Sequence, residues 1–199
     1  MAIPIAVVGA DLDLMDDLSK GDFEIVGYFS MQDKKIGFEY LGNHLSIGDL
    51  NPKVKLIVAV DDTILREYIW TNHGSKVIQY VSELSNVSKR SELGCGVVIY
   101  PHVFISAGVE IADLAKISVG SQIHHESHVG EFSVLAPMTL VLGRVHIGSH
   151  VFLGSNSSIA PNVRVENRAF VGMSSNVVRN VVEGSKVWGN PAKIVKQEN

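Results

Sequence analysis

The chain has 199 residues, of which 46% are hydrophobic, and a formal net charge of −4. This composition is sufficient for a packed core, and the usual domain sizes allow one domain or a small domain joined to a larger one. The charges are scattered and form no basic run, which argues against nucleic acid or an anionic membrane surface as a partner.

Cys95 is the only cysteine, so no intrachain disulfide can form and a reducing compartment is favoured. The N-terminal segment MAIPIAVVGADLD has no basic region, and no apolar run approaches the roughly twenty residues of a membrane span. We therefore expect a cytoplasmic protein without a membrane segment.

Residues 1–80 alternate between strand and helix patterns. The short apolar runs IAVVGA, FEIVGYF and KLIVAV are typical of strands, whereas DLMDDLSK and TILREYIWTNHG are typical of short helices. This order predicts a small α/β domain with a parallel sheet, of the Rossmann-like class. Ligands of such sheets bind beyond the carboxyl ends of the strands, so the candidate binding residues are Gly9, Ala10, Asp11, Ser30 and Asp61. The first loop, GADLDL, lacks the G-x-G-x-x-G pattern, and no dinucleotide is expected.

The rest of the chain follows a strict six-residue repeat. Every sixth residue from Leu93 to Val177 is aliphatic, and the residue four places later, from Val97 to Val181, is small or β-branched. A coil of three short strands gives this period, whereas helices and simple strand alternation do not. The two rows share one side of each strand. The repeat therefore predicts a triangular parallel β-helix over residues 81–199, with both rows in its interior.

The segment SQIHHESHVGEF, residues 121–132, contains three histidines and two glutamates. In the repeat, His125 and Glu126 occupy places where the coil turns, so their side chains should point outward at an edge of the prism. Histidines on one short segment of a coil diverge, and no second group of ligands is visible, which argues against a metal site. The pattern alone predicts solvated edge histidines here, as it does for the other histidines of the coil: His102, His124, His128, His146 and His150.

The repeat, the small N-terminal domain and the terminal VWGNPAKIVK together resemble the hexapeptide-repeat acyltransferases, whose parallel β-helix is left-handed. The resemblance extends over nearly the whole chain and is most specific from about residue 93 to 195. Within that family the chain looks like the branch that acetylates nucleotide-linked 4-amino-4,6-dideoxysugars, whose relatives include sialic-acid O-acetyltransferases. The resemblance implies a homotrimer with clefts between subunits. It also implies that residues 1–80 bind the nucleotide end of the sugar and that residues 81–199 transfer the acetyl group.

The resemblance also implies catalytic roles. The family segment I-x-H-E-x-x-I-G-x-F matches IHHESHVGEF without an insertion, which places His125 as general base and Glu126 as its carboxylate partner. An imidazole is suited to take the proton of an attacking amine, and a carboxylate can orient the ring. Gly143 stands where the family offers a backbone N–H to the acetyl carbonyl oxygen. Acetyl-CoA is the implied cosubstrate, no metal is implied, and the implied CoA contacts are Val134, Ser155, Met173, Gly189, Asn190, Pro191 and Lys193.

Several positions depart from the family pattern. The first loop of the family resembles G-x-x-G-H-G, but here it reads GADLDL, and Asp61 replaces a glycine commonly found after the third strand. The second histidine of the family motif F-S-H is Val134, and His102 or His128 could take its place in space. These departures leave the sugar, its nucleotide carrier and the pathway open.

The sequence thus predicts an acetyl-CoA-dependent sugar N-acetyltransferase that works by direct attack of the amine on the thioester. O-acetylation of a sugar or of sialic acid by the same residues is the first alternative. A non-catalytic β-helix scaffold is the second. The His125–Glu126 pair and the GNPAK tail argue against a scaffold, whereas the altered first loop argues for it.

Overall fold

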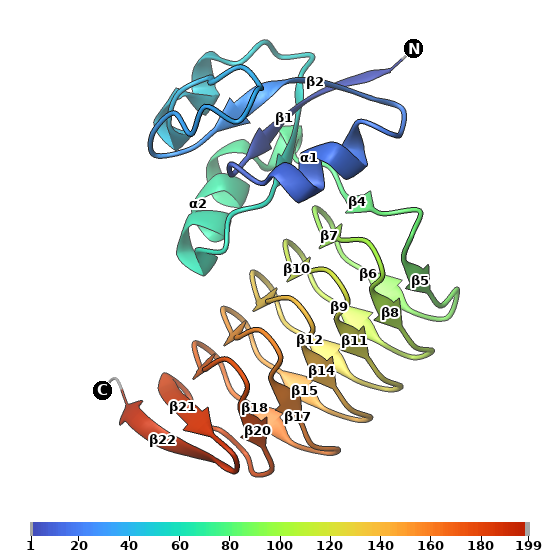
Figure 1. Ribbon diagram of the computed structural model, residues 1–199, viewed down its shortest axis with the longest axis vertical. Coiled ribbons are helices and arrows are strands. Elements are labelled where there is room, and N and C mark those ends of the chain that lie inside the picture. The colour runs from blue at the N-terminus through green and yellow to red at the C-terminus, as the bar shows by residue number, and fades with distance from the viewer. Residues whose placement is uncertain (1, 198–199) are drawn as a thin grey trace.

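A computed structural model describes residues 2–197, which form a small α/β domain placed on one end of a long three-sided coil (Figure 1). The described helices include none that is long and apolar enough to cross a membrane. The last helical element of the α/β part is η2 (Gly74–Lys76), and the first strand of the coil is β4 (Tyr80–Val81).

The α/β domain has a three-stranded parallel sheet in the order β2-β1-β3. Its elements are β1 (Ile3–Val8), α1 (Leu12–Leu18), β2 (Phe23–Phe29), η1 (His44–Asp49), β3 (Lys55–Val58) and α2 (Thr63–His73). Asp11 and Asp62 begin the two α-helices, because their carboxylates accept hydrogen bonds from the first free backbone N–H groups. The central strand β1 and the edge strand β3 both end in continuous apolar residues that are buried on both faces.

The coil consists of short parallel strands stacked in three sheets. The eight-stranded sheet runs β22-β21-β19-β16-β13-β10-β7-β4, the six-stranded sheet β20-β17-β14-β11-β8-β5, and the five-stranded sheet β18-β15-β12-β9-β6. From β4 to β20, strands that pair lie eighteen residues apart, as Gln122 pairs with Leu140, whereas β21 pairs with β19 only sixteen residues later. The predicted parallel β-helix is therefore confirmed, with three hexads in each turn.

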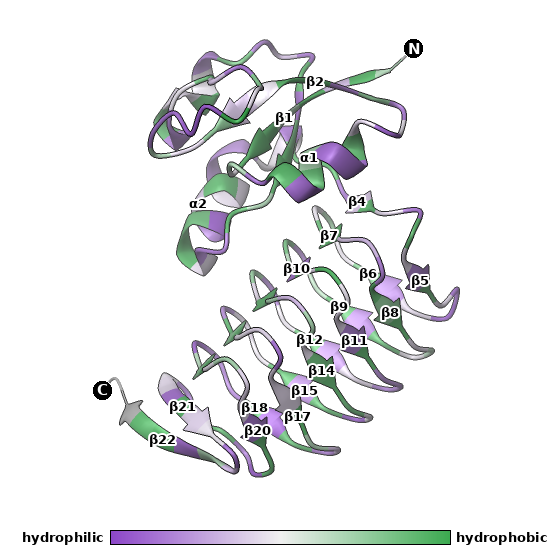
Figure 2. Ribbon diagram, in the orientation of Figure 1, coloured by the Kyte–Doolittle hydropathy of each residue, from purple (hydrophilic) through white to green (hydrophobic). Residues whose placement is uncertain are grey.

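The two-residue strands of the coil are β4 (Tyr80–Val81), β5 (Asn86–Val87), β6 (Glu92–Leu93), β7 (Val98–Ile99), β8 (Phe104–Ile105), β9 (Glu110–Ile111), β10 (Lys116–Ile117), β11 (Gln122–Ile123), β12 (His128–Val129), β13 (Val134–Leu135), β14 (Leu140–Val141), β15 (His146–Ile147), β16 (Phe152–Leu153), β17 (Ser158–Ile159), β18 (Arg164–Val165), β19 (Phe170–Val171) and β20 (Asn176–Val177). In Figure 2, hydrophobic and hydrophilic residues alternate along each coil. The aliphatic row is buried from Ile99 to Val177, as is the small row from Val97 to Val181.

The small row also joins successive coils by hydrogen bonds. The hydroxyl of Ser133 donates to the carbonyl of Gly148 at 2.8 Å and accepts from the N–H of Val151 at 3.0 Å. Ser127 makes the same pair of bonds one hexad earlier. A buried hydroxyl without partners would cost stability, so these serines are suited to a dry interior.

The corners of the coil have a regular backbone conformation. Every sixth residue has a positive φ, in the left-handed region that non-glycine residues enter at a cost of about 1–2 kcal/mol. These corner residues are Gly96, His102, Gly108, Leu114, Gly120, Glu126, Phe132, Met138, Arg144, His150, Asn156, Asn162, Arg168 and Ser174. The corner geometry is therefore imposed by the coil and accepted by polar, charged and apolar residues, but none of these corner residues is β-branched.

The chain ends in an antiparallel hairpin of β21 (Ser185–Gly189) and β22 (Ala192–Gln197), which extends the eight-stranded sheet. Trp188 covers Gly172, where any β-carbon would overlap the indole ring. The hairpin turn approaches a corner of the last coil, because the N–H of Gly189 donates to the hydroxyl of Ser175 at 3.1 Å.

Candidate active site

Two edges of the prism carry the predicted catalytic and CoA-binding residues. The first, which we call the histidine edge, joins the six-stranded and five-stranded sheets at residues 107–108, 125–126, 143–144 and 161–162. The second, the methionine edge, joins the eight-stranded and six-stranded sheets at residues 101–102, 119–120, 137–138, 155–156 and 173–174. Successive corners of one edge are stacked, since they lie one full coil apart.

His125 and Glu126 lie at an exposed corner of the histidine edge. The coil turns between Ile123, which is buried, and His128 of the next sheet, so both side chains point away from the core. The Nδ1 atom of His125 lies 3.4 Å from the Oε2 atom of Glu126, and the two side chains are 51% and 64% exposed. A carboxylate at Nδ1 leaves Nε2 free to accept a proton from a substrate.

Gly143 lies directly next to the ring of His125, one coil further along the edge. A β-carbon at Gly143 would lie 2.5 Å from Nε2 and 2.7 Å from Cε1 of His125. The ring therefore covers the α-carbon of Gly143, and only glycine leaves room for it there. Within the described residues, the N–H of Gly143 donates to no other group of the chain. The structure thus brings the three predicted catalytic residues together.

Arg144 adds a positive charge to this corner, which the sequence analysis did not anticipate. Its Nη1 atom lies 3.8 Å from Oε2 of Glu126, the same oxygen that faces His125. Its Nε atom donates to the amide oxygen of Asn162 at 2.9 Å. Glu126 therefore lies between an imidazole and a guanidinium. Arg144 could be found only by adding eighteen residues to Glu126, once the coil length is known.

The other histidines of the coil lie elsewhere. His124 packs against Phe104 with ring centroids 5.8 Å apart, and His128 stacks on His146 at 4.9 Å on the five-stranded sheet. For His150, the prediction of a solvated edge histidine is wrong. Its side chain is only 11% exposed, and its Nε2 atom lies 3.6 Å from Oε2 of Glu67 in α2. It is buried because α2 covers this corner. In the part of the chain that is described, no three His, Cys, Asp or Glu residues are placed to hold a metal ion.

A cavity of about 600 Å³ opens at the carboxyl ends of β1, β2 and β3. All five predicted substrate-binding residues line it: Gly9, Ala10, Asp11, Ser30 and Asp61. Gly9 has a φ of +126°, and a β-carbon there would lie 3.2 Å from the backbone between Ala59 and Val60, so the first loop needs glycine at this position. Lys34, His44 and Asp62 also line the cavity.

Lys116 is a further residue of this cavity that the sequence analysis assigned to no site. It belongs to β10 of the coil, yet its Nζ atom donates to the carbonyl of Ala59 at 2.8 Å and contacts Asp61 at 2.9 Å. Nearby, the hydroxyl of Tyr100 donates to Asp11 at 2.5 Å. Burial and the adjacent Asp11 carboxylate raise the pKa of Tyr100 far above its ordinary value, so the hydroxyl remains a donor.

Most of the predicted CoA contacts lie along the methionine edge. Ser155 and Met173 are stacked at successive corners, and Met173 is 63% exposed. The hairpin turn with Gly189, Asn190 and Pro191 approaches the same edge through Ser175, and Lys193 follows it in β22. Val134 differs, because its side chain is completely buried in the eight-stranded sheet. It is therefore not accessible to a ligand.

The cavity and His125 lie on opposite sides of the same prism. Lys116, which lines the cavity, belongs to the eight-stranded sheet, whereas the histidine edge joins the other two sheets. In a triangular prism that edge is opposite the eight-stranded face. A ligand bound in the cavity of one chain is thus separated from His125 of that chain by the width of the coil.

No protein-family model matches the chain, and neither does any curated protein sequence. Solved structures do match it. PerB from Caulobacter crescentus, in complex with CoA and GDP-perosamine, has a TM-score of 0.89 and 24% identity over 97% of each chain. The acetyltransferase domain of PglB from Neisseria gonorrhoeae FA1090 has a TM-score of 0.87 and 22% identity, covering 97% of this chain and 100% of that one.

WeeI from Acinetobacter baumannii AYE is a third match, with a TM-score of 0.83 and 21% identity over 96% of this chain and 99% of that one. Each comparison covers the α/β domain as well as the coil. These likenesses establish that the chain has the fold of these proteins over nearly its whole length.

Proposed function

We propose that the protein is an acetyl-CoA-dependent N-acetyltransferase that acts on a nucleotide-linked 4-amino-4,6-dideoxysugar. The observation that carries the proposal is the arrangement of His125, whose ring is held between the carboxylate of Glu126 and the α-carbon of Gly143. The comparisons support it, because PerB was solved with CoA and GDP-perosamine and is a perosamine N-acetyltransferase.

The reaction follows from this arrangement. The sugar amine attacks the carbonyl carbon of the thioester, a C–N bond forms, and Nε2 of His125 takes the proton that the amine loses. Glu126 favours the imidazolium that develops. The N–H of Gly143 donates to the oxygen that becomes negative. When the intermediate collapses, the C–S bond breaks, the amide remains on the sugar, and the sulfur of CoA leaves as the thiolate or takes the proton from His125.

We further propose that the active site is shared between chains of a homotrimer. The support is the separation of His125 from the cavity, which leaves the site of one chain incomplete. Three prisms arranged about a threefold axis, with their six-stranded sheets toward that axis, bring the histidine edge of one chain to the methionine edge of the next. His125 then faces the Ser155–Met173 side and the eight-stranded sheet of its neighbour.

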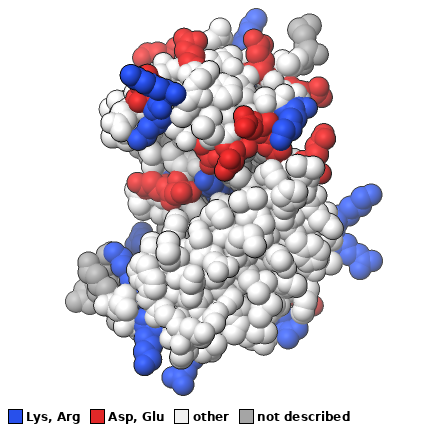
Figure 3. All heavy atoms as spheres, in the orientation of Figure 1, with Lys and Arg blue, Asp and Glu red and all other residues white. Residues whose placement is uncertain are grey.

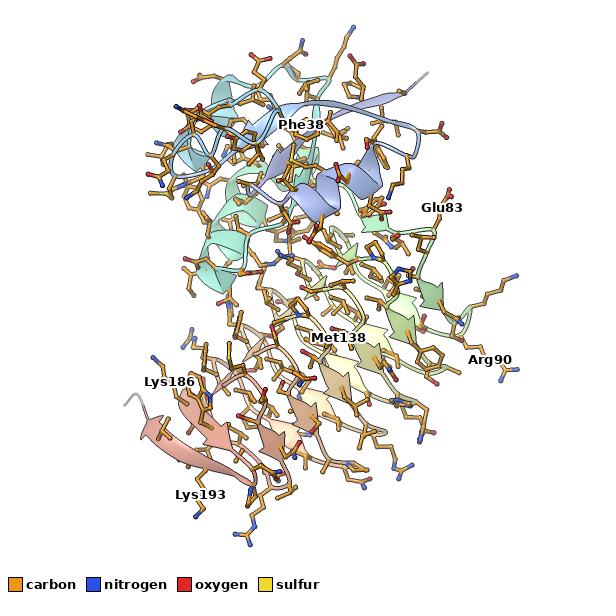
Figure 4. The ribbon with its side chains drawn as sticks, viewed as in Figure 1. Phe38, Glu83, Arg90, Met138, Lys186 and Lys193 are labelled. Carbon is orange, nitrogen blue, oxygen red and sulfur yellow. The ribbon has the colours of Figure 1, made fainter. Side chains whose placement is uncertain are left out.

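The surface chemistry of the coil favours this arrangement. The outer row of the six-stranded sheet has no charged residue: Asn86, Phe104, Gln122, Leu140, Ser158 and Asn176. Figure 3 shows a broad face of the coil that is free of charged side chains, and Figure 4 places Met138 on this face. Met138 and Met173 are 58% and 63% exposed in a single chain. Exposed apolar residues on an uncharged face are typical of a contact between subunits.

We also propose that the coil is left-handed, that the α/β domain is of the Rossmann-like class, and that the protein is cytoplasmic. The sequence resemblance supports the first two, together with likenesses that include both parts of the chain. The lone cysteine Cys95 supports the third.

Three measurements test the proposal. Calorimetry should detect acetyl-CoA binding, and mass spectrometry should find an acetylated product from a panel of nucleotide-linked amino sugars, with hydroxy sugars and sialic acid as comparison. Acetylation of hydroxy substrates alone would show an O-acetyltransferase, and the absence of acetyl-CoA binding would favour a scaffold. Light scattering that finds only monomers at micromolar concentration would contradict the shared site.

A further inference from the structure

One buried cation of the coil joins the two loops that form the cavity. Lys116 is 5% exposed, and its Nζ atom lies 2.8 Å from the carbonyl oxygen of Ala59, 2.9 Å from Oδ1 of Asp61 and 3.5 Å from Oδ2 of Asp11. The same Nζ atom lies 5.0 Å from the centre of the Tyr100 ring. A lysine is rarely buried unless it is paired, and here the oxygen atoms that bind the ammonium group all come from the α/β domain.

A second buried cation holds the same segment from within the α/β domain. Arg66 of α2 is completely buried, and its Nη1 atom donates to the carbonyls of Val58 at 3.1 Å and Val60 at 2.9 Å. Its Nε atom donates to the carbonyl of Leu114 in the coil at 2.7 Å. Three consecutive carbonyls at the end of β3 are thus bound by Arg66 and Lys116. Of these two cations, only Lys116 also contacts the loop after β1, through Asp11.

The contacts of Lys116 explain two unusual positions in the sequence. Asp11 and Asp61 lie in the loops that depart from the family pattern, and both carboxylates face Lys116. Asp11 is fixed further, because its Oδ1 atom accepts from the N–H of Leu14 at the start of α1. Figure 3 shows acidic side chains gathered at the junction of the two domains, with a basic side chain among them. The altered loops are therefore built around a cation from the coil.

We propose that Lys116 is a positioning residue for the sugar-nucleotide cavity, and this inference rests on the proposed function of that cavity. By binding Asp11, Ala59 and Asp61 at once, it fixes the loops after β1 and β3 relative to each other and to the coil. The coil carries the acetyl-transfer edges, so Lys116 also sets where the bound sugar lies relative to them. Without the ammonium group, two carboxylates at the floor of the cavity lose their common cation and repel each other.

Lys116→Met tests the inference, because methionine keeps the length of the apolar stem and removes the charged amino group. We expect amide exchange in residues 9–14 and 59–65 to become about tenfold faster, and exchange around His125 to stay unchanged. The KM for the amino sugar should rise about tenfold, while the KM for acetyl-CoA stays the same. Lys20→Met is the matched control, because Lys20 is 68% exposed and pairs only weakly with Asp17 at 3.9 Å.

A second variant separates charge compensation from simple packing. A triple variant combines Lys116→Met with Asp11→Asn and Asp61→Asn. It removes the repulsion between the two carboxylates while keeping the shape of the loops, because asparagine also begins a helix well. Slow exchange should return in both loops. Unchanged exchange in Lys116→Met, or equal changes in both KM values, would overturn the inference. The exchange measurement needs no substrate, so it remains decisive even if the wild-type protein acetylates no amino sugar.

Discussion

The chemistry of the site depends on a contact between an imidazole ring and the α-carbon of a glycine. Glu126 faces Nδ1 of His125, and Gly143 leaves room beside Nε2. The ring is therefore oriented from both sides although the corner is open to solvent. Orientation of this kind matters because a general base must lie within hydrogen-bond reach of the proton that it removes.

His125→Ala should lower turnover by roughly a hundred- to ten-thousandfold, the range for loss of a positioned general base. Binding of acetyl-CoA and the melting temperature should change little, because the side chain is exposed and fills no core position. Glu126→Gln should cost less, and His124→Ala should cost little. Equal losses for His124→Ala and His125→Ala in steady-state kinetics would contradict this role.

Gly143→Ala should reduce kcat by at least about tenfold, because the new β-carbon would overlap Nε2 of His125 and displace the ring. The effect should disappear in the His125→Ala background, where no ring remains to be displaced. Gly48→Ala serves as the control, since a β-carbon at Gly48 meets nothing within 4 Å. Additive losses in the double variant would show that Gly143 acts independently of the ring.

At the scale of the elements, the corner conformation explains why the coil tolerates so many residue types. Arg168 is an exposed corner residue with a φ of 58°. Arg168→Val should lower the free energy of unfolding by about 1–2 kcal/mol, because a β-branched side chain is disfavoured in the left-handed region. Arg168→Gly at the same position should be neutral or slightly stabilising. Denaturant unfolding measures both, and equal stabilities for the two variants would contradict the explanation.

The stacked pair on the five-stranded sheet should make stability depend on pH. Burial, with the nearby charges of Arg164 and His128, holds the pKa of His146 below its ordinary value. The unfolded chain therefore binds a proton more readily, and stability is lost as the pH falls through the histidine range toward the folded pKa. His146→Gln should reduce the loss between roughly pH 7 and pH 5 in thermal melts. If His146→Gln left the pH dependence of stability unchanged, other groups would be responsible for it.

The sequence predicted the repeat well because the interior of a coil admits few residue types. Aliphatic and small rows could be read directly from Leu93 onward. Positions that face outward carry no such constraint, so the contact of Lys116 with Asp11 and Asp61 was not visible. The partners lie far apart along the chain, and nothing in the pattern indicates which face the first domain covers. For the same reason His150 was predicted to be solvated although α2 buries it.

At the scale of the whole molecule, a shared site makes complementation possible. A His125→Ala chain keeps its cavity, and a Lys116→Met chain, which should be about tenfold less active at sugar concentrations well below its KM, keeps His125. Random mixing of equal amounts into trimers should form a competent pair at roughly a quarter of the sites. Co-expression of the two variants should therefore give more activity than either variant alone. A site contained in one chain would give only the average of the two variants.

Because paired strands are eighteen residues apart, the number of a coil residue gives its position on the prism. As far as β20 every coil has eighteen residues, so the remainder after division by eighteen gives the face or corner of a residue, and the quotient gives its height along the axis. Removing one complete coil, residues 145–162, would keep every later residue on its face and shorten the prism by about 4.8 Å, the spacing between paired strands. Removing a single residue would rotate all later ones out of place. In the repeat of this chain, length can therefore change only in whole turns, and the deletion of residues 145–162 would leave Gly143 beside the ring of His125.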